Sequence, residues 1–530
     1  MALLVKEVGI GQIINLNYYI KITQSPLLCP LTLGGKCVLA NPPKPIGKEF
    51  RFATYVNPPD SQSADLTVVK EIIHYDDGST RPNLNLIENN KRPFWVTAKG
   101  MRNHQQKKEW ALEEELIRYE TRQCDLQFQA AVALGMRHLT NADNGMRTLK
   151  KSPYLYGVDI SPTAILKHNY LKKYGVTTPQ TMLSLGVIDI ETGMLADNKG
   201  IIMLTFTMGS VCVTAVRADV VKNIPLLDVL VDQCMNKYLS KYVQERNIKP
   251  ELYIAETEID LLKIVFGRIH EEKPDVLAVW NLDFEISRFE EAAARAGVDL
   301  KDIVCDPSIK PEYRFFHYKR GQKQKKTSSG KIMPIKPAAQ WHTVTAPASF
   351  YFLDGMCAYK HTRAGVQEEQ SYGLDAILEK HKLPAKLDIP EAAHLQKARW
   401  HIFMQQNHMV EYIVYNRFDC ITVELLQEEI KDLTAVVPLL CENSDFEDMK
   451  SQPKRLVDAL HWEVQESGYI IGCTADSIVD EFDGDTTSRD GWVVTLPAPL
   501  ISKAGLRVIE ENDRLDTSVY AFVGDLDVSA

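Results

Sequence analysis

The sequence has no cysteine pair at CxxC spacing, although it contains ten Cys in 530 residues. Scattered cysteines argue against a disulfide-stapled secreted fold and against a zinc ribbon. The sequence also lacks any run of about eighteen apolar residues, and its first residues lack the long apolar stretch of a signal peptide. We therefore expect a protein of the reducing cytoplasm with no membrane partner.

Positive charge is also scarce, because 61 Lys and Arg face 70 Asp and Glu and give a net charge of −9. A protein that binds nucleic acid contacts phosphates through Lys and Arg, so such contacts would depend on local basic segments. The most basic segment is residues 318–331, which contains Lys323, Lys325 and Lys326. This segment fits either a solvated loop or an arm that follows a nucleic-acid strand beside an active site.

The length of the chain predicts about three domains. Residues 1–175 mix strand-like stretches with a helix expected at 105–116, and they carry no catalytic constellation. Residues 176–435 alternate strand and helix, which predicts an α/β domain with one main sheet. Residues 436–530 contain a segment rich in Asp, Thr, Pro and Gly, and they end in an apolar strand that delivers Asp525 and Asp527.

Two acids end the apolar strand expected at residues 181–193, which is followed by a second strand at 200–207. Because strand side chains alternate between faces, Asp189 and Glu191 share one face and Ile188 and Ile190 the other. Two carboxylates on one face can share a metal ion. A solvated strand end with the same spacing is the structural alternative.

A second acidic cluster follows the buried strand expected at residues 274–280 and opens a helix that ends at Gly297. It contains Asp283 and Glu285, which lie near the positive end of the helix. A third cluster lies in the helix expected at 409–426, where Tyr415 and Asp419 are four residues apart and therefore on one face. Helix capping by Asp283 and core packing by Tyr415 are the structural alternatives.

The three clusters together resemble the motifs of the DnaQ-like 3′→5′ exonucleases of the DEDDy branch: Asp-x-Glu, Asn-x₂₋₃-Phe-Asp and Tyr-x₃-Asp. The resemblance implies an RNase H-like fold and a site for two Mg²⁺ ions, with Mn²⁺ as a substitute. It assigns metal binding to Asp189, Glu191 and Asp419, and the positioning of water to Tyr415.

The second motif departs from the family pattern, because Phe284 is followed by Glu285 where the family has Asp. Glu285 fits by register and Asp283 fits by residue type. We favour Glu285 as the ligand of the second metal ion, with Asp283 as the alternative. The resemblance further implies that Asn281 and Phe284 contact DNA.

The final residues resemble the start of motif A in the palm of family B DNA polymerases, in which an Asp before a Ser-containing turn binds the polymerase metals. Asp527 is the better candidate by that pattern, and Asp525 is the alternative. Residues 91–95 and 154–160 resemble the same family, and the replicative polymerases of tailed phages are the closest type. The implied organisation is an N-terminal domain (1–175), an exonuclease domain with an inserted hairpin (176–435) and an incomplete palm (436–530).

This family implies proofreading of DNA 3′ ends in the cytoplasm of a phage-infected bacterium. The expected partners are primer-template DNA, single-stranded 3′ ends and a separate chain that carries the rest of the polymerase. We do not expect this chain alone to extend a primer. The alternative is a largely non-catalytic half that binds DNA and docks a polymerase subunit. A free-standing ribonuclease of the same fold is a third reading.

Overall fold

The structure is a computed structural model that describes residues 42–436, 461–473, 506–511 and 514–519. Within the first range it leaves out residues 106, 107, 109, 175–180, 196–198, 327–330, 336–339, 364–368, 386, 388 and 396. Asp525 and Asp527 lie outside the described residues, so the motif expected there stays a prediction.

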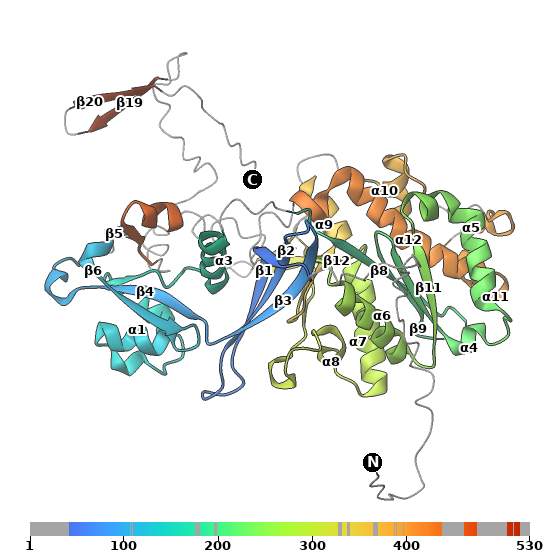
Figure 1. The fold of residues 1–530 in the computed structure, drawn as a ribbon, viewed down its shortest axis with the longest axis horizontal. Helices are drawn as coiled ribbons and strands as arrows, with labels where there is room; N and C mark the ends of the chain where they lie inside the picture. Colours follow the sequence, from blue (N-terminus) through green and yellow to red (C-terminus); the bar gives the residue numbers. More distant parts are fainter. Residues whose placement is uncertain are drawn as a thin grey trace, which may run out of the picture. The chain divides into compact units, whose positions relative to one another are not determined.

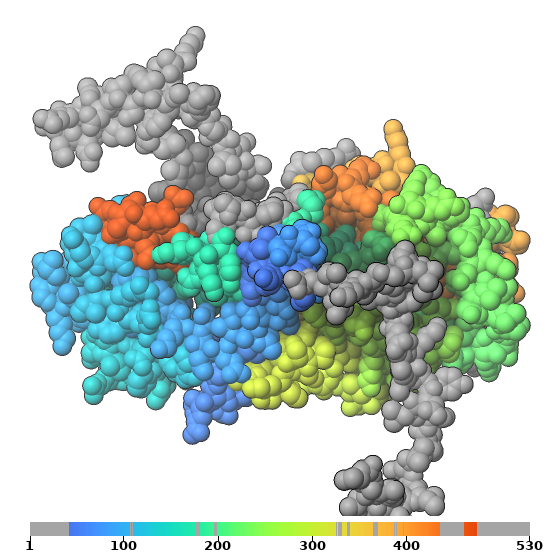
Figure 2. Space-filling model, viewed as in Figure 1, coloured from blue at the N-terminus to red at the C-terminus, as the bar shows by residue number. Residues whose placement is uncertain are grey.

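Mixed α/β structure is confirmed, with several separate sheets (Figure 1). The first sheet is an antiparallel meander of β1 (Pro45–Val56), β2 (Leu66–Tyr75) and β3 (Thr80–Glu88). Helix α3 (Pro162–Tyr174) packs against β1, and Figure 2 shows its surface beside that of this sheet. A second small sheet has the order β6-β4-β7, in which β4 is Lys91–Thr97, β6 is Leu116–Arg122 and β7 is Leu155–Tyr156.

The largest sheet has six strands in the order β11-β10-β9-β8-β12-β17. Their bounds are β8 (Leu185–Thr192), β9 (Ile201–Met208), β10 (Val211–Arg217), β11 (Lys249–Ala255), β12 (Val276–Val279) and β17 (Tyr351–Asp354). Strand β9 runs antiparallel to β8 and β10, whereas β8, β12 and β17 are parallel neighbours. The antiparallel pairing of β8 with β9 confirms the predicted hairpin.

Helices cover both faces of this sheet (Figure 1). One face packs against α6 (Glu258–Glu272), α7 (Leu282–Ala296) and α8 (Lys301–Val304). The other face packs against helices that include α5 (Leu227–Glu245), α9 (Gly355–Thr362), α10 (Leu374–Lys380) and α12 (Met409–Ile430), with α11 (Ala398–Asn407) beside α12. Gly297 adopts a left-handed conformation (φ +66°) and ends α7, as predicted.

The segment between β12 and β17 contains four short strands: β13 (His317–Lys319), β14 (Gln324–Lys326), β15 (Ile332–Pro334) and β16 (Thr343–Thr345). Strand β14 pairs antiparallel with β15, and β13 pairs antiparallel with β16. The basic segment of the sequence therefore belongs in part to a hairpin.

The prediction of a helix at residues 105–116 is wrong for the part of this segment that the structure describes. Trp110–Leu112 forms strand β5, a 3₁₀ turn follows at Glu113–Glu115, and β6 begins at Leu116. Strand β5 pairs with β18 (Tyr469–Ile471), and β6 pairs with β4. Pairing with strands that are distant in the sequence has overridden the helical preference of a segment rich in Glu.

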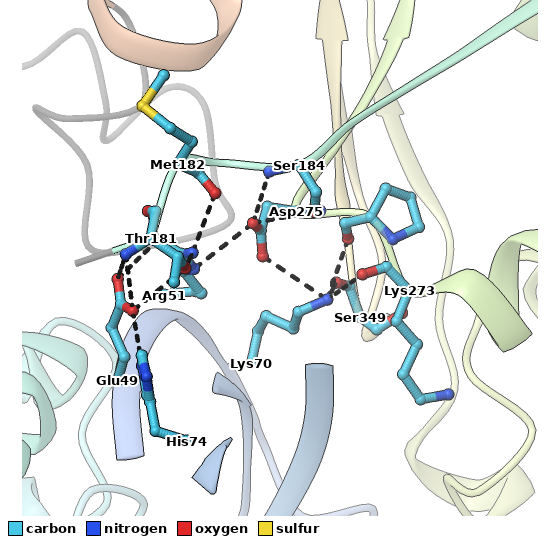
Figure 3. A network of polar contacts seen from close by, with 11 residues as sticks. Glu49, Arg51, Lys70, His74, Thr181, Met182, Ser184, Lys273, Asp275 and Ser349 are labelled. Atoms are coloured by element: carbon cyan, nitrogen blue, oxygen red, sulfur yellow. Dashed lines mark hydrogen bonds and ion pairs between the residues drawn. The ribbon is translucent and has the colours of Figure 1, made fainter. Parts of the chain in front are cut away.

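Lys70 of β2 links the first sheet to the amino-terminal ends of β12 and β17 (Figure 3). The Lys70 side chain is fully buried. Its ammonium donates hydrogen bonds to the carbonyl oxygens of Lys273, Pro274 (3.2 Å) and Ser349 (3.0 Å), and it lies 3.7 Å from Asp275 Oδ1. One cation therefore holds two strand ends of the six-stranded sheet.

Arg51 and Glu49 of β1 extend this network (Figure 3). Arg51 Nη1 donates to the Thr181 carbonyl at 2.8 Å, and Arg51 Nε lies 3.5 Å from Asp275 Oδ2. Glu49 accepts from the Thr181 backbone N–H at 3.1 Å and lies 3.2 Å from His74 Nε2. The chain segment that leads into β8 is thus fixed to the first sheet.

The described residues from Pro45 onward belong to one compact unit. The boundaries expected near residues 175 and 435 remain predictions. Among the described residues, no helix is both long and apolar enough to cross a membrane.

Candidate metal centre

Strand β8 ends with two acids on one face of the sheet. Ile188 and Ile190 lie in the core formed with α6 and α7 on the opposite face. Asp189 and Glu191 face α12, where Asn416 Nδ2 donates a 2.6 Å hydrogen bond to Asp189 Oδ2. The placement predicted from strand alternation is confirmed.

Helix α12 brings a third acid to this pair. One carboxylate oxygen each of Asp189, Glu191 and Asp419 lies within 4.8 Å of the other two. Residues far apart in the sequence therefore converge as predicted, because the long α12 packs across β8 and β9. Carboxylate oxygens at this spacing suit a hard divalent cation such as Mg²⁺ or Ca²⁺.

The acids of the cluster lie close together, and little positive charge from the protein offsets their negative charge. Burial raises the pKa of Asp189 and of Asp419 well above the usual range, and repulsion from the neighbouring acids raises both further. Among the described residues, no Lys or Arg forms an ion pair with Asp189, Glu191 or Asp419. A bound cation would relieve this repulsion.

Of the two acids of the second motif, Glu285 is the one that interacts electrostatically with Asp189. Its side chain, in the first turn of α7, is buried (4% exposed), and its Oε2 has no hydrogen-bond partner among the described residues. Burial raises the pKa of the Glu285 carboxyl well above the usual range, with Asp189 as the largest charged contributor. A buried carboxylate oxygen without a partner is costly unless it binds a ligand.

Asp283 is held by the segment before the β14–β15 hairpin. Its Oδ1 accepts from the Tyr318 hydroxyl at 2.6 Å and from Arg320 Nε at 3.2 Å. Its side chain is 45% exposed, whereas Glu285 is buried. Partial burial acts to raise the Asp283 pKa, but these hydrogen bonds and nearby charges outweigh it and lower the pKa.

Tyr415 lies one helical turn before Asp419 and beside it. A hydrogen bond between the two acts to lower the pKa of Asp419, and burial followed by the Asp419 charge raises the pKa of the Tyr415 phenol. The Trp400 ring of α11 packs on the Tyr415 ring with centroids 4.7 Å apart. Tyr415 is therefore a protonated hydroxyl fixed at the edge of the acid cluster.

Two residues of α12 that were not predicted from the sequence touch the acids directly. The Tyr412 hydroxyl donates a hydrogen bond to Glu191 Oε2, and Asn416 donates to Asp189. Their spacing contained the signal, because positions 412, 415, 416 and 419 follow the i, i+3, i+4, i+7 pattern of one helix face. Once Tyr415 and Asp419 were singled out, the other two positions of that face were identifiable.

The residues expected to contact DNA lie at the surface where the structure describes their side chains. Asn281, Lys323 and Lys326 are exposed, and Phe284 is 38% exposed with the Arg288 guanidinium 5.4 Å from its ring centroid. The side chain of Lys325 lies outside the described residues. DNA contact by these residues stays a prediction.

Asp354 has a structural role in the N-terminal turns of two helices. Its carboxylate is buried, and it accepts hydrogen bonds from the backbone N–H groups of Cys357 (2.7 Å) and Leu282 (3.3 Å). It therefore caps α9 and supports the start of α7. Burial raises the pKa of Asp354 to about 6.

No protein-family model matches the chain, and no curated protein sequence matches it.

Proposed function

We propose that the chain is the 3′→5′ proofreading exonuclease part of a family B DNA polymerase of the phage type, active in DNA replication. Its substrate would be the 3′ end of DNA, and its product nucleoside monophosphates. The convergence of Asp189, Glu191 and Asp419 within 4.8 Å carries this proposal.

The sheet supports an RNase H-like arrangement. Strands β8 and β12 are parallel neighbours, so their carboxyl ends lie at the same end of the sheet. Sites in α/β sheets form beyond the carboxyl ends of the strands. Strand β8 delivers Asp189 and Glu191 there, and the turn after β12 leads into α7 and delivers Glu285.

The donor set fits two divalent cations. Asp189, Glu191 and Asp419 would hold one Mg²⁺ or Mn²⁺ ion, and Asp189 with Glu285 would hold the second. The second assignment is supported by the Glu285 oxygen for which the described part of the chain offers no hydrogen-bond partner. Bound cations would polarise the scissile phosphodiester and neutralise the charge that develops on the leaving 3′ oxygen.

The side chains around the cluster would prepare the attack. Tyr415 would orient the attacking water through its hydroxyl, which the contact with Trp400 keeps in place. Asn416 would keep Asp189 in a fixed rotamer through its hydrogen bond. Exposed Phe284, next to Glu285 at the start of α7, would stack on a terminal base.

A degradation assay on 3′-labelled single-stranded DNA tests this proposal. We expect release of labelled nucleoside monophosphate with Mg²⁺ and none with EDTA. Asp189→Ala should reduce the rate about 100-fold or more, because it removes a carboxylate shared by both cations. Wild-type rates in that variant would refute the assignment of the site. A preference for RNA over DNA would refute the proofreading role.

A further inference from the structure

Tyr412 sits between the metal centre and α11. Its side chain is fully buried, and its hydroxyl contacts three side chains: Glu191 Oε2, His401 Nδ1 at 2.8 Å and Gln405 Nε2 at 3.4 Å. Its ring lies parallel to that of Tyr415, with centroids 6.1 Å apart. One phenol thus connects a proposed metal ligand to a neighbouring helix.

The chemistry of the partners fixes the direction of each hydrogen bond. Glu191 as a carboxylate only accepts, so it takes the single Tyr412 hydroxyl hydrogen. The Gln405 amide nitrogen only donates, so the Tyr412 oxygen accepts from it. His401 Nδ1 must then also donate, because the phenol has no second hydrogen to give. A tyrosine phenol is protonated at neutral pH, so the Tyr412 hydroxyl has its hydrogen to donate.

Gln405 also fixes the backbone that carries Glu191. The pairing of β8 with β9 shifts register between Glu191 and Thr192. Just beyond this irregularity, Gln405 Nε2 donates to the Thr192 carbonyl at 2.9 Å, and Gln405 Oε1 accepts from the Met194 N–H at 2.8 Å. The same amide therefore holds both the backbone after Glu191 and the phenol that contacts its side chain.

We infer that Tyr412 is a positioning residue that, with His401 and Gln405 of α11, orients the Glu191 carboxylate for binding a divalent cation. The inference rests on the proposed function and adds a residue that the three exonuclease motifs do not contain. Groups that hydrogen-bond a metal ligand typically change metal affinity or activity about 10- to 100-fold when they are removed.

Mn²⁺ binding to the purified full-length chain, measured by the electron paramagnetic resonance signal of free Mn²⁺, tests this inference without a nuclease assay. Tyr412→Phe removes only the hydroxyl and should weaken Mn²⁺ binding about 10- to 100-fold. Gln405→Met, on a different element, should weaken binding in the same direction. It keeps the inference testable if Tyr412→Phe does not fold.

Tyr170→Phe is a matched control. Tyr170 is also a buried tyrosine whose hydroxyl donates to a carboxylate, that of Glu71 at 2.8 Å, but it lies in α3. The Tyr170→Phe substitution should lower the stability of the fold without changing its affinity for Mn²⁺. Unchanged Mn²⁺ affinity in folded Tyr412→Phe and Gln405→Met would overturn the inference. A wild-type chain that binds no Mn²⁺ would overturn the proposed function and this inference with it.

Discussion

Glu285 and Asp283 are two residues apart, yet they have opposite environments. Glu285 is buried with an oxygen that has no hydrogen-bond partner among the described residues, whereas Asp283 is partly exposed and accepts hydrogen bonds from Tyr318 and Arg320. On a helix, residues two apart point in different directions. We therefore expect Glu285, rather than Asp283, to be the ligand of the proposed second cation, although the family that the motif resembles has Asp at that position.

We predict that Glu285→Gln lowers the rate of DNA degradation about 100-fold or more, because a weaker ligand replaces a carboxylate at the second cation. Asp283→Asn should change the rate by about fivefold at most, since it weakens only an exposed contact worth about 1 kcal/mol. Single-turnover rates on the same labelled oligonucleotide measure both. A larger loss in Asp283→Asn would reverse the assignment.

Asp189→Asn should abolish cleavage and at the same time stabilise the metal-free protein. The clustered acids repel one another, so removing one charge should raise the free energy of unfolding at neutral pH by about 0.5–2 kcal/mol. Chemical denaturation in EDTA measures this change. Asp219→Asn provides the opposite control, because hydrogen bonds from Arg217 lower the Asp219 pKa and neutralisation should destabilise the fold. A destabilised Asp189→Asn would argue against repulsion in the cluster.

At the scale of elements, β2 and the six-stranded sheet depend on each other through Lys70. Its ammonium satisfies carbonyl oxygens before β12 and β17 and offsets the charge of Asp275. Lys70→Met should lower the free energy of unfolding by about 3 kcal/mol, because it leaves buried carbonyls and a buried carboxylate without this partner. Lys310→Met breaks an exposed pair with Glu88 and should cost under about 1 kcal/mol. Urea denaturation compares the two, and equal effects would contradict the role of Lys70.

The same lysine predicts a pH dependence. Burial lowers the pKa of Lys70 to about 8, and Asp275 opposes this shift without cancelling it. An unfolded Lys has a pKa of about 10.4, so between these values the unfolded chain binds more protons and stability rises with pH. The unfolding free energy of the wild type relative to Lys70→Met should therefore increase from about pH 8 to pH 10.4. A flat difference would show that Lys70 keeps an ordinary pKa, and a falling difference would show that its pKa is raised.

The confirmed predictions are those in which chemistry and local periodicity agreed. They depend on neighbouring residues: the apolar runs of β8, β9 and β12, the cap at Gly297, and the four-residue spacing of Tyr415 and Asp419. Tyr412 was missed because a tyrosine on an apolar helix face usually packs in a core. The prediction of a helix at 105–116 was wrong because β5, in this segment, pairs with β18, which is distant in the sequence. The link from Lys70 to β12 and β17 has no local signature in the sequence either.

At the scale of the whole molecule, cation binding should stabilise the fold. A ligand that binds only the folded state adds about 2.7 kcal/mol when present at 100 times its dissociation constant. Mn²⁺ should therefore raise the melting temperature of the wild type, and it should leave the melting temperature of Asp189→Ala unchanged. Differential scanning calorimetry with and without Mn²⁺ measures the shift. An equal shift in Asp189→Ala would place the stabilising ion elsewhere.

The anchoring of β12 and β17 by Lys70 sets a limit on how small an active fragment can be made. A truncated protein that starts at residue 176 would retain every acid of the proposed centre but would lose β1 and β2. The amino-terminal ends of β12 and β17, at the opposite end of these strands from the acids, would then be exposed to water. A minimal fragment with the proposed activity should therefore be cut upstream of Pro45 and keep the first sheet.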